Sequence, residues 1–161
     1  MIGSGSPLRT ASGFVSDFTL EPVRQWTGTL EVQTRGRGFH PLTEALQVPV
    51  RDSDITNGSL HLFLRHTSAS LTVTEIADPD VLKDLETVIS RLGPDGDPEY
   101  LHRLEGPDDM AAHVRSVLTQ TEVTLPVRNG RLALGTWQGV FLWEHRHRAH
   151  ARQLEITLLG D

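Results

Sequence analysis

The chain has 161 residues, most simply one domain with room for a substantial hydrophobic core. Its formal net charge is −6, and no cysteine is present. The acidic balance argues against general nucleic-acid binding, and the lack of cysteine excludes disulfides, thiol catalysis and Cys-ligated zinc. No apolar run approaches the roughly 18 residues of a membrane span. Without a recognisable secretory signal, we expect a cytoplasmic protein that binds neither membrane nor nucleic acid.

Residues 1–22 are rich in Gly, Ser and Pro and have weak periodicity, which predicts a flexible N-terminal arm. The remainder, 23–161, is predicted to be one domain. Residues 26–34 alternate as a strand does, and residues 43–47 are predicted to form one short helical turn. Further strands are expected at 59–65, 71–74, 122–128, 131–134, 138–145 and 152–159.

Two longer helices are predicted. Asp78 and Pro79 suit an N-cap and the first helical position, and apolar residues then recur at helical spacing as far as Leu92. Asp108 is expected to cap a second helix over roughly 109–118. Short strands separated by turns indicate an α+β class. We expect a mostly antiparallel β-sandwich, jelly-roll-like, with two helices packed outside in a single domain.

A polar segment interrupts two of the predicted strands. It contains His66, Thr67, Ser68 and Ser70. Hydroxyl groups and backbone N–H groups at a strand break can form a cradle for an anion. The alternative is a Ser/Thr-rich turn whose hydroxyls bond only to the local backbone.

The second candidate group precedes and enters the 109–118 helix. Asp109 and His113 are four residues apart and share a helix face, and His102 lies in the preceding loop. Two imidazoles and a carboxylate could ligate zinc or a similar ion, or could supply a general base held by a carboxylate. The alternative is an acidic helix start with surface histidines.

The third group occupies residues 144–152, which hold three His and three Arg. Arginine can hold a phosphate or a carboxylate through paired hydrogen bonds. Glu144, His145 and Arg152 lie nearest the strand ends and are the better site candidates. The residues between them are predicted to form a solvated hairpin loop.

Residues 129–139 form the most unusual segment. They begin with Asn-Gly, the strongest short hairpin signal, and contain two further glycines. Glycine weakens a strand unless the backbone bends there or something approaches closely. The segment is therefore interpreted as sheet scaffold that carries a site, with Arg131, Gly135, Thr136 and Gln138 as candidate ligand contacts.

Taken in order, these motifs resemble the YjbQ family of small bacterial and archaeal proteins. They are HTSAS at 66–70, Glu75 with ADPD at 77–80, Asp84, His102, EG at 105–106, DDM at 108–110, His113, NGRLALGTWQG at 129–139 and EHR at 144–146. The resemblance covers roughly residues 24–160. It implies an α+β fold with a β-sandwich core, assembled as a homotrimer with clefts between subunits. It also implies a weak thiamine-phosphate synthase activity, which joins a pyrimidine diphosphate to a thiazole phosphate and releases pyrophosphate.

Our first hypothesis is a trimeric enzyme that acts on a small phosphorylated metabolite in a cleft between subunits. The expected catalytic residues are His102, Asp109, His113 and Glu75. The expected substrate-binding residues are His66, Thr67, Ser68, Ser70, Arg131, Gly135, Thr136, Gln138, Glu144 and Arg152. A divalent metal, either Zn²⁺ or Mg²⁺, is expected on His102, His113 and His145. The rival hypothesis is a protein that binds a small anion, with or without a metal, but does not turn it over.

Overall fold

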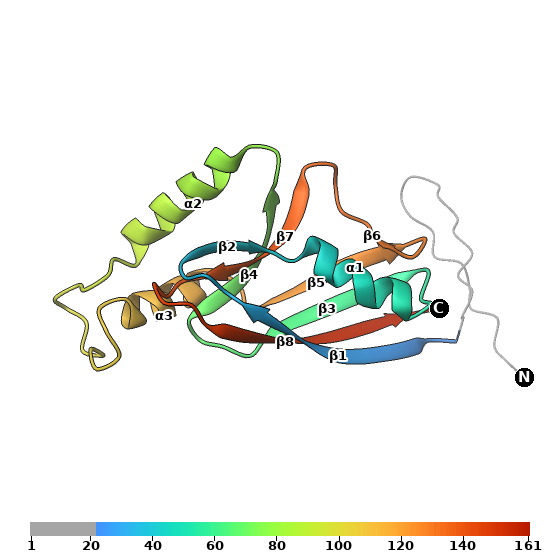
Figure 1. Cartoon of the computed structure of the whole chain (residues 1–161), viewed down its shortest axis with the longest axis horizontal. Coiled ribbons are helices and arrows are strands. Elements are labelled where there is room, and N and C mark those ends of the chain that lie inside the picture. The colour runs from blue at the N-terminus through green and yellow to red at the C-terminus, as the bar shows by residue number, and fades with distance from the viewer. Residues whose placement is uncertain (1–21) are drawn as a thin grey trace, which may run out of the picture.

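The computed structural model describes residues 22–161, so the predicted arm lies outside the described residues apart from its last residue. Eight strands and three helices make up the described chain (Figure 1). The strands are β1 (Arg24–Gln33), β2 (Gly38–Pro41), β3 (Gly58–Leu64), β4 (Ala69–Glu75), β5 (Glu122–Arg128), β6 (Arg131–Leu132), β7 (Gln138–Glu144) and β8 (Ala151–Gly160). The helices are α1 (Thr43–Asp52), α2 (Pro79–Leu92) and α3 (Asp109–Leu118).

The strands form two antiparallel sheets. One has five strands in the order β1-β8-β3-β5-β6, and the other has three in the order β2-β7-β4. The predicted α+β class with mostly antiparallel strands is therefore confirmed, whereas the jelly-roll-like detail stays a prediction. The hairpin expected at the Asn-Gly pair is present, and Asn129 and Gly130 both have positive φ (51° and 68°).

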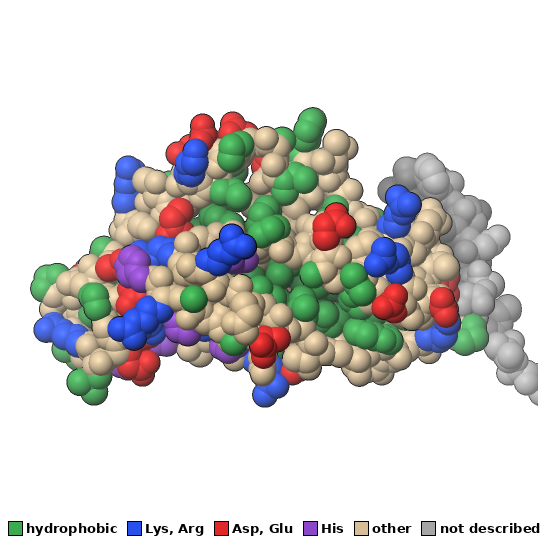
Figure 2. Space-filling model, in the orientation of Figure 1, with side chains coloured by type: hydrophobic (Ala, Val, Ile, Leu, Met, Phe, Trp, Pro, Cys, Tyr) green, Lys and Arg blue, Asp and Glu red, His purple; other side chains and the backbone are tan. Residues whose placement is uncertain are grey.

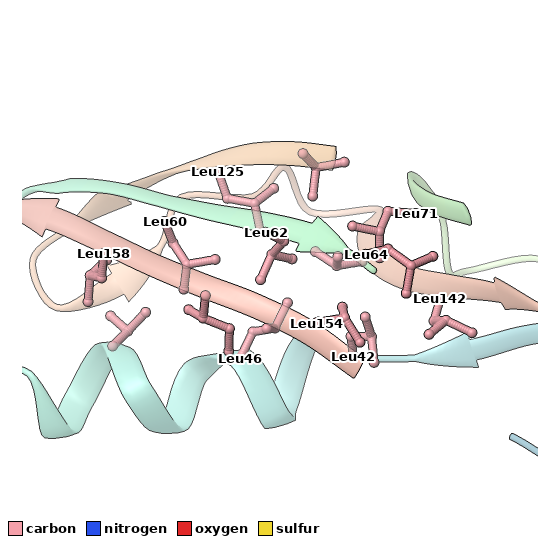
Figure 3. Close-up of a cluster of buried hydrophobic side chains, with 14 of the residues drawn as sticks. Leu42, Leu46, Leu60, Leu62, Leu64, Leu71, Leu125, Leu142, Leu154 and Leu158 are labelled. Carbon is pink, nitrogen blue, oxygen red and sulfur yellow. The ribbon is translucent and has the colours of Figure 1, made fainter. Parts of the chain in front are cut away.

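The core lies between α1 and the larger sheet and continues into the smaller one (Figure 3). Strand β8 alternates buried and exposed residues, as a strand with one covered face does. Its buried side chains meet those of β3, and Leu46 of α1 packs toward them. The buried leucines at its centre are Leu42, Leu46, Leu60, Leu62, Leu64, Leu71, Leu142, Leu154 and Leu158.

Helix α1 corrects the prediction at residues 43–47. One short helical turn was expected there, and only two longer helices were expected elsewhere in the chain. Helix α1 continues to Asp52 with Pro49 inside it. Proline normally ends a helix because it lacks an N–H and its ring crowds the preceding turn. Here the helix buries Leu46 and Val50 completely in the core, and this packing outweighs the local cost. Strand β2 was also not predicted.

Helices α2 and α3 match their predicted limits. The Asp78 carboxylate accepts a hydrogen bond from the backbone N–H of Asp80 at 2.9 Å, so the expected N-cap of α2 is confirmed. In the described part of the chain, none of the helices is both long and apolar enough to span a membrane.

The pairing of β4 with β7 sets the positions of the candidate residues. Ala69 lies opposite Glu144 at one end of the pair, and Glu75 lies opposite Gln138 at the other. Six residue steps separate the two ends, about 20 Å at the usual rise of a strand. Helix α3 packs at the Ala69 end, where the Ser116 hydroxyl donates to the Ala69 carbonyl at 2.8 Å.

The Leu154→Ala substitution should destabilise the protein by about 2–5 kcal/mol, because it leaves a cavity in a fully buried part of the core. Leu101→Ala is the matched control, since that side chain is 94% exposed and its loss should change the free energy of unfolding by less than about 0.5 kcal/mol. Urea unfolding of both variants measures the difference. Equal losses would contradict the assigned core.

Candidate functional site

Three predicted catalytic residues meet at the start of α3. The Oδ2 atom of Asp109 lies 2.7 Å from Nε2 of His102 and 3.4 Å from Nε2 of His113. One donor atom from each residue lies within 4.8 Å of the other two, close enough for a single metal ion. Asp109 is 2% exposed, whereas both imidazoles are partly open to solvent. Solvent therefore reaches the cluster from the histidine side.

The backbone determines which nitrogen of His113 carries a proton. Nδ1 of His113 lies 2.9 Å from the carbonyl oxygen of Thr67. A carbonyl can only accept, so Nδ1 is the protonated nitrogen and the neutral ring presents the Nε2 lone pair to Asp109. A lone pair and a carboxylate oxygen that face one another require a cation between them. Either a proton or a metal ion satisfies this arrangement.

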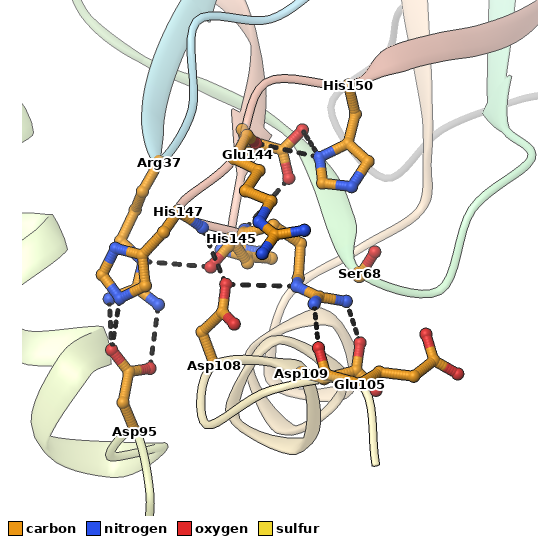
Figure 4. Close-up of polar contacts among 12 residues, drawn as sticks. Arg37, Ser68, Asp95, Glu105, Asp108, Asp109, Glu144, His145, His147 and His150 are labelled. Carbon is orange, nitrogen blue, oxygen red and sulfur yellow. Dashed lines mark hydrogen bonds and ion pairs between the residues drawn. The ribbon is translucent and has the colours of Figure 1, made fainter. Parts of the chain in front are cut away.

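Arg146, just after β7, holds Asp109 in place. Its Nη1 donates to Oδ1 of Asp109, and its Nε donates to Oδ2 of Asp108 at 3.1 Å. Its Nη2 donates to the Glu105 carbonyl at 2.8 Å. Figure 4 shows Asp108 and Asp109 facing the side chains that follow β7. One guanidinium thus joins the sheet to α3 and leaves Oδ2 of Asp109 for the histidines.

Asp108 stands at the N-cap position that the sequence predicts, but its side chain does not cap the helix. Its backbone is already helical, and its side chain makes no capping hydrogen bond. Its Oδ2 instead accepts from Arg146 and, at 2.8 Å, from the backbone N–H of His147. Burial opposes ionisation of this carboxyl, but these hydrogen bonds lower its pKa overall. Asp108 therefore anchors the loop after β7.

A second buried ion pair lies next to this one. The fully buried Glu144 carboxylate accepts from Nε of Arg152 at 2.7 Å and from the Thr34 hydroxyl at 3.0 Å. It also accepts from the backbone N–H of Arg146 at 3.0 Å, which links the two pairs. Burial alone would raise the pKa of Glu144, but the Arg152 contact and the other hydrogen bonds lower it. Nη2 of Arg152 reaches the Ser68 hydroxyl at 3.1 Å.

The expected metal ligand His145 lies elsewhere. Its side chain is fully buried, and its Nε2 lies 2.9 Å from the Ser70 hydroxyl. In the described part of the chain, Nδ1 of His145 has no hydrogen-bond partner. The structure therefore does not bring His145 to His102 and His113, and the third side chain that lies beside these two histidines is that of Asp109. Ser70 is likewise buried and does not face solvent as a ligand contact would.

The remaining polar segment before β4 frames the cluster mainly through its backbone. Thr67 accepts from His113 through its carbonyl, and Nε2 of His66 accepts the Gln153 backbone N–H at 2.8 Å. Burial and the Arg152 charge lower the pKa of His66, which favours its neutral ring. The Thr67 side chain is exposed and the Ser68 side chain is half-buried, so both remain candidates for ligand contact.

Five predicted site residues lie away from the cluster within one chain. Glu75 and Gln138 lie at the opposite end of the β4–β7 pair, and the Gln138 side-chain oxygen accepts the Gly135 backbone N–H at 2.8 Å. Thr136 lies in the same exposed turn, and Arg131 lies on β6. The structure does not bring these residues to the His–Asp cluster of the same chain.

The two neighbouring ion-pair groups, centred on Arg146 and Arg152, form one polar network whose charges are nearly balanced. Three carboxylates, from Asp108, Asp109 and Glu144, pair with the guanidinium groups of Arg146 and Arg152. Figure 2 shows His, Arg and acidic side chains intermixed over the end of the molecule that carries α3. Both guanidinium groups are already paired and offer little to an anion, so the network itself favours a cation at the cluster.

The prediction missed Arg146, Thr34 and the anchoring role of Asp108. Arg146 belongs to the Glu-His-Arg motif that carried the family resemblance, so a signal for it was present. Thr34 has no comparable signal, because it lies 110 positions from the Glu144 carboxylate to which it donates.

His145 should make the protein less stable in acid. Burial, and secondarily the nearby Arg115 charge, lower its pKa from 6.5 to about 3. Between these values the unfolded chain takes up a proton that the folded chain does not, so stability falls as the pH is lowered through this window. The contribution of His145 to the slope of the free energy of unfolding against pH approaches about 1.4 kcal/mol per pH unit.

The measurement is urea unfolding of wild type and His145→Gln between pH 7 and pH 4. The variant should lose this part of the slope, whereas His61→Gln, at a half-exposed histidine of β3, should keep it. An unchanged slope in His145→Gln would contradict the assignment.

Comparison with known proteins shows the family to which the chain belongs. The family model described as UPF0047 protein YjbQ-like matches residues 28–161. A UPF0047 protein from Synechocystis is 47% identical over 138 residues, covering 86% of this chain and 94% of its own. UPF0047 protein YjbQ from Escherichia coli O157:H7 is 43% identical over 134 residues, covering 83% and 96%.

Solved structures extend the similarity to the fold. A conserved hypothetical protein from Thermus thermophilus superposes with a TM-score of 0.72 at 36% identity, covering 80% of this chain and 97% of its own. A protein of unknown function from Sulfolobus solfataricus gives a TM-score of 0.78 at 25% identity, covering 87% and 100%. The matched residues include the polar cluster and both sheets, and the chain belongs to the YjbQ/UPF0047 family.

Proposed function

We propose that His102, Asp109 and His113 form a divalent-metal centre of an enzyme that acts on a small phosphorylated metabolite. The observation that carries this proposal is the convergence of both Nε2 atoms on one carboxylate oxygen. The Thr67 carbonyl supports it, because it fixes the His113 tautomer that can ligate a metal. Three protein ligands leave further coordination positions for water or substrate.

The ligand set favours Zn²⁺, or another transition metal, over Mg²⁺. Imidazole nitrogen suits Zn²⁺, whereas Mg²⁺ prefers oxygen ligands and keeps several waters. Arg146 would act as the outer partner that orients the ligating carboxylate. The loss of a partner of this kind typically weakens metal binding by about 10–100-fold.

A bound metal would also supply the positive charge that a phosphate needs. Both guanidinium groups of the network are already paired with carboxylates, so they offer little attraction to an anion. A divalent ion can neutralise the charge that develops on a departing phosphate or pyrophosphate. Thr67 contacts His113 through its carbonyl, and the hydroxyls of Thr67 and the adjacent Ser68 would hold the remaining phosphate oxygens.

The candidate reaction is the one the family resemblance implies, in which a pyrimidine diphosphate joins a thiazole phosphate and pyrophosphate is released. His102 is the more exposed imidazole, and its Nε2 would ligate the metal on the solvent-facing side of the cluster. Glu144 is fully buried, and its role is to fix Arg152 and the end of β7.

A homotrimer would complete the site. Glu75, Arg131 and the turn that carries Thr136 are too far along the sheet to reach the cluster of their own chain. Large apolar side chains near that turn are exposed, including Trp137 at 65% and Ile76 at 54%. Association of copies would cover this surface and could bring the turn to a neighbouring cluster.

Metal binding is tested by titration of the metal-free protein with Zn²⁺. Wild type should bind one ion per chain, and His102→Ala should weaken binding by more than about 100-fold, because it removes a ligand rather than an outer partner. His61→Ala is the matched control, since His61 is a partly exposed histidine outside the cluster. Equal affinity in all three proteins would exclude the proposed centre.

Catalysis is tested by supplying both phosphorylated precursors to the Zn²⁺-loaded protein and measuring thiamine phosphate. His113→Ala and Asp109→Asn should abolish product formation, and His61→Ala should retain it. Full activity in both cluster variants would show that the assigned mechanism is wrong. Tight binding of the precursors without any product would favour a non-catalytic, metal-dependent binding protein.

A further inference from the structure

The segment between α2 and α3 is a loop whose two ends are joined. The backbone N–H of Gly96 donates to the Pro107 carbonyl at 2.8 Å, so residues 96–107 leave and re-enter the body of the molecule at one place. Figure 1 shows this loop projecting beyond the sheets at the end of the molecule that carries α3. A compact surface loop of roughly 6–16 residues with adjacent ends is an Ω-loop, a type that frequently has a functional role.

Inside the loop, hydrogen bonds join its own residues. The backbone N–H of Tyr100 donates to the Asp97 carbonyl at 3.1 Å, and that of Glu99 donates to Oδ1 of Asp97 at 2.9 Å. The Arg103 guanidinium donates to the carbonyls of Tyr100 and Pro98. These bonds do not depend on the rest of the protein, so the loop can move as one unit without unfolding.

The loop takes no part in the hydrophobic core. None of residues 96–107 is buried. Leu101 and Leu104 are 94% and 98% exposed, the two largest values among the large apolar side chains of the described chain. A segment without buried apolar contacts opens at a low cost in free energy.

His102 ties the loop to the His–Asp cluster. Its Nε2 lies 2.7 Å from Oδ2 of Asp109. Among the described residues, no other side chain of 97–105 makes a hydrogen bond or an ion pair outside the loop. The backbone adds one contact, from Nη2 of Arg146 to the Glu105 carbonyl at 2.8 Å. The position of the loop therefore depends strongly on the group that binds His102.

Glycines with positive φ lie at both ends of the loop. The φ angles are 66° at Gly96 and 108° at Gly106, where other residues would be strained. The loop also lines a cavity of about 310 Å³ that His102 shares, so it is not tightly packed on that side. Hinges are a few residues at the ends of a mobile segment that absorb a change of backbone angles. Gly96 and Gly106 meet this description.

We propose that residues 96–107 form a flap that swings at Gly96 and Gly106, and that a metal ion on His102, Asp109 and His113 holds it closed. This inference rests on the proposed function for the metal. The open flap exposes Asp109 and His113 and admits the ion, and the bound ion then recruits His102. Because coupling is reciprocal, closure raises the affinity for the metal by the factor by which the metal favours closure.

Hydrogen exchange followed by NMR tests the flap at single amides. Saturating Zn²⁺ should slow exchange at Gly96, at the base of the flap, by at least about tenfold, because the open flap lacks one of the three ligands. The Tyr100 amide is bonded inside the flap, so its exchange should change much less. The Leu71 amide, which donates to the Gln120 carbonyl at 2.8 Å outside the flap, is the control and should not change.

A metal-free arm separates the flap from the metal centre. Without metal, His102→Ala should speed exchange at Gly96 by about tenfold, as expected for the loss of one hydrogen bond to a charged group, and His61→Ala should not. Failure of Zn²⁺ to bind would overturn the metal centre, while faster exchange in metal-free His102→Ala would still support the flap. Bound Zn²⁺ without slower exchange at Gly96 would overturn the metal latch. Unchanged exchange in His102→Ala, or equal changes at Gly96 and Tyr100, would overturn the flap.

Discussion

The contact between Arg146 and the two aspartates at the start of α3 organises the candidate site. A carboxylate as buried as Asp109 is costly unless it is paired, because it loses its hydration. Arg146 supplies that pairing from the end of β7 and also binds Asp108. The orientation of the Asp109 carboxylate, and hence the oxygen offered to the histidines, follows from this contact.

The same contact limits the attraction of the site for an anion. Each cation of the network is matched to a carboxylate, so the local charge does not favour a phosphate. Nε2 of His113 instead presents an electron pair toward the free oxygen of Asp109, and Nε2 of His102 lies within 2.7 Å of the same oxygen. Chemistry on an anion at this point depends on a cation brought to it. This is why a metal and a phosphate belong together in the proposed function.

Much of the local structure was predictable because its signals are local. Helices α2 and α3 have apolar residues at helical spacing, and α2 also has a cap and a proline at its first position. Helix α1 was underestimated because Pro49 is a strong local signal for a helix end. Only the burial of Leu46 and Val50 against the sheets explains why the helix continues.

The site was predictable only in part. The spacing of Asp109 and His113 predicts a shared helix face, whereas the position of His102 beside them is a result of the tertiary structure. The sequence also placed His145 among the ligands, because a histidine at a strand end resembles one that faces a site. Instead His145, directly after β7, is buried and lies beside the Ser70 hydroxyl, a contact across 75 positions of the chain.

By itself the sequence determined the family, the antiparallel α+β character, two of the three helices and the residue types of the His–Asp cluster. The tertiary structure decided that Asp109 and not His145 meets the two histidines, that Arg146 holds it, and that Glu75 and Arg131 lie apart from it. The physical reason is separation along the chain. Arg146 and Asp109 are 37 positions apart, and only the packing of α3 against the end of the β4–β7 pair brings their charges together.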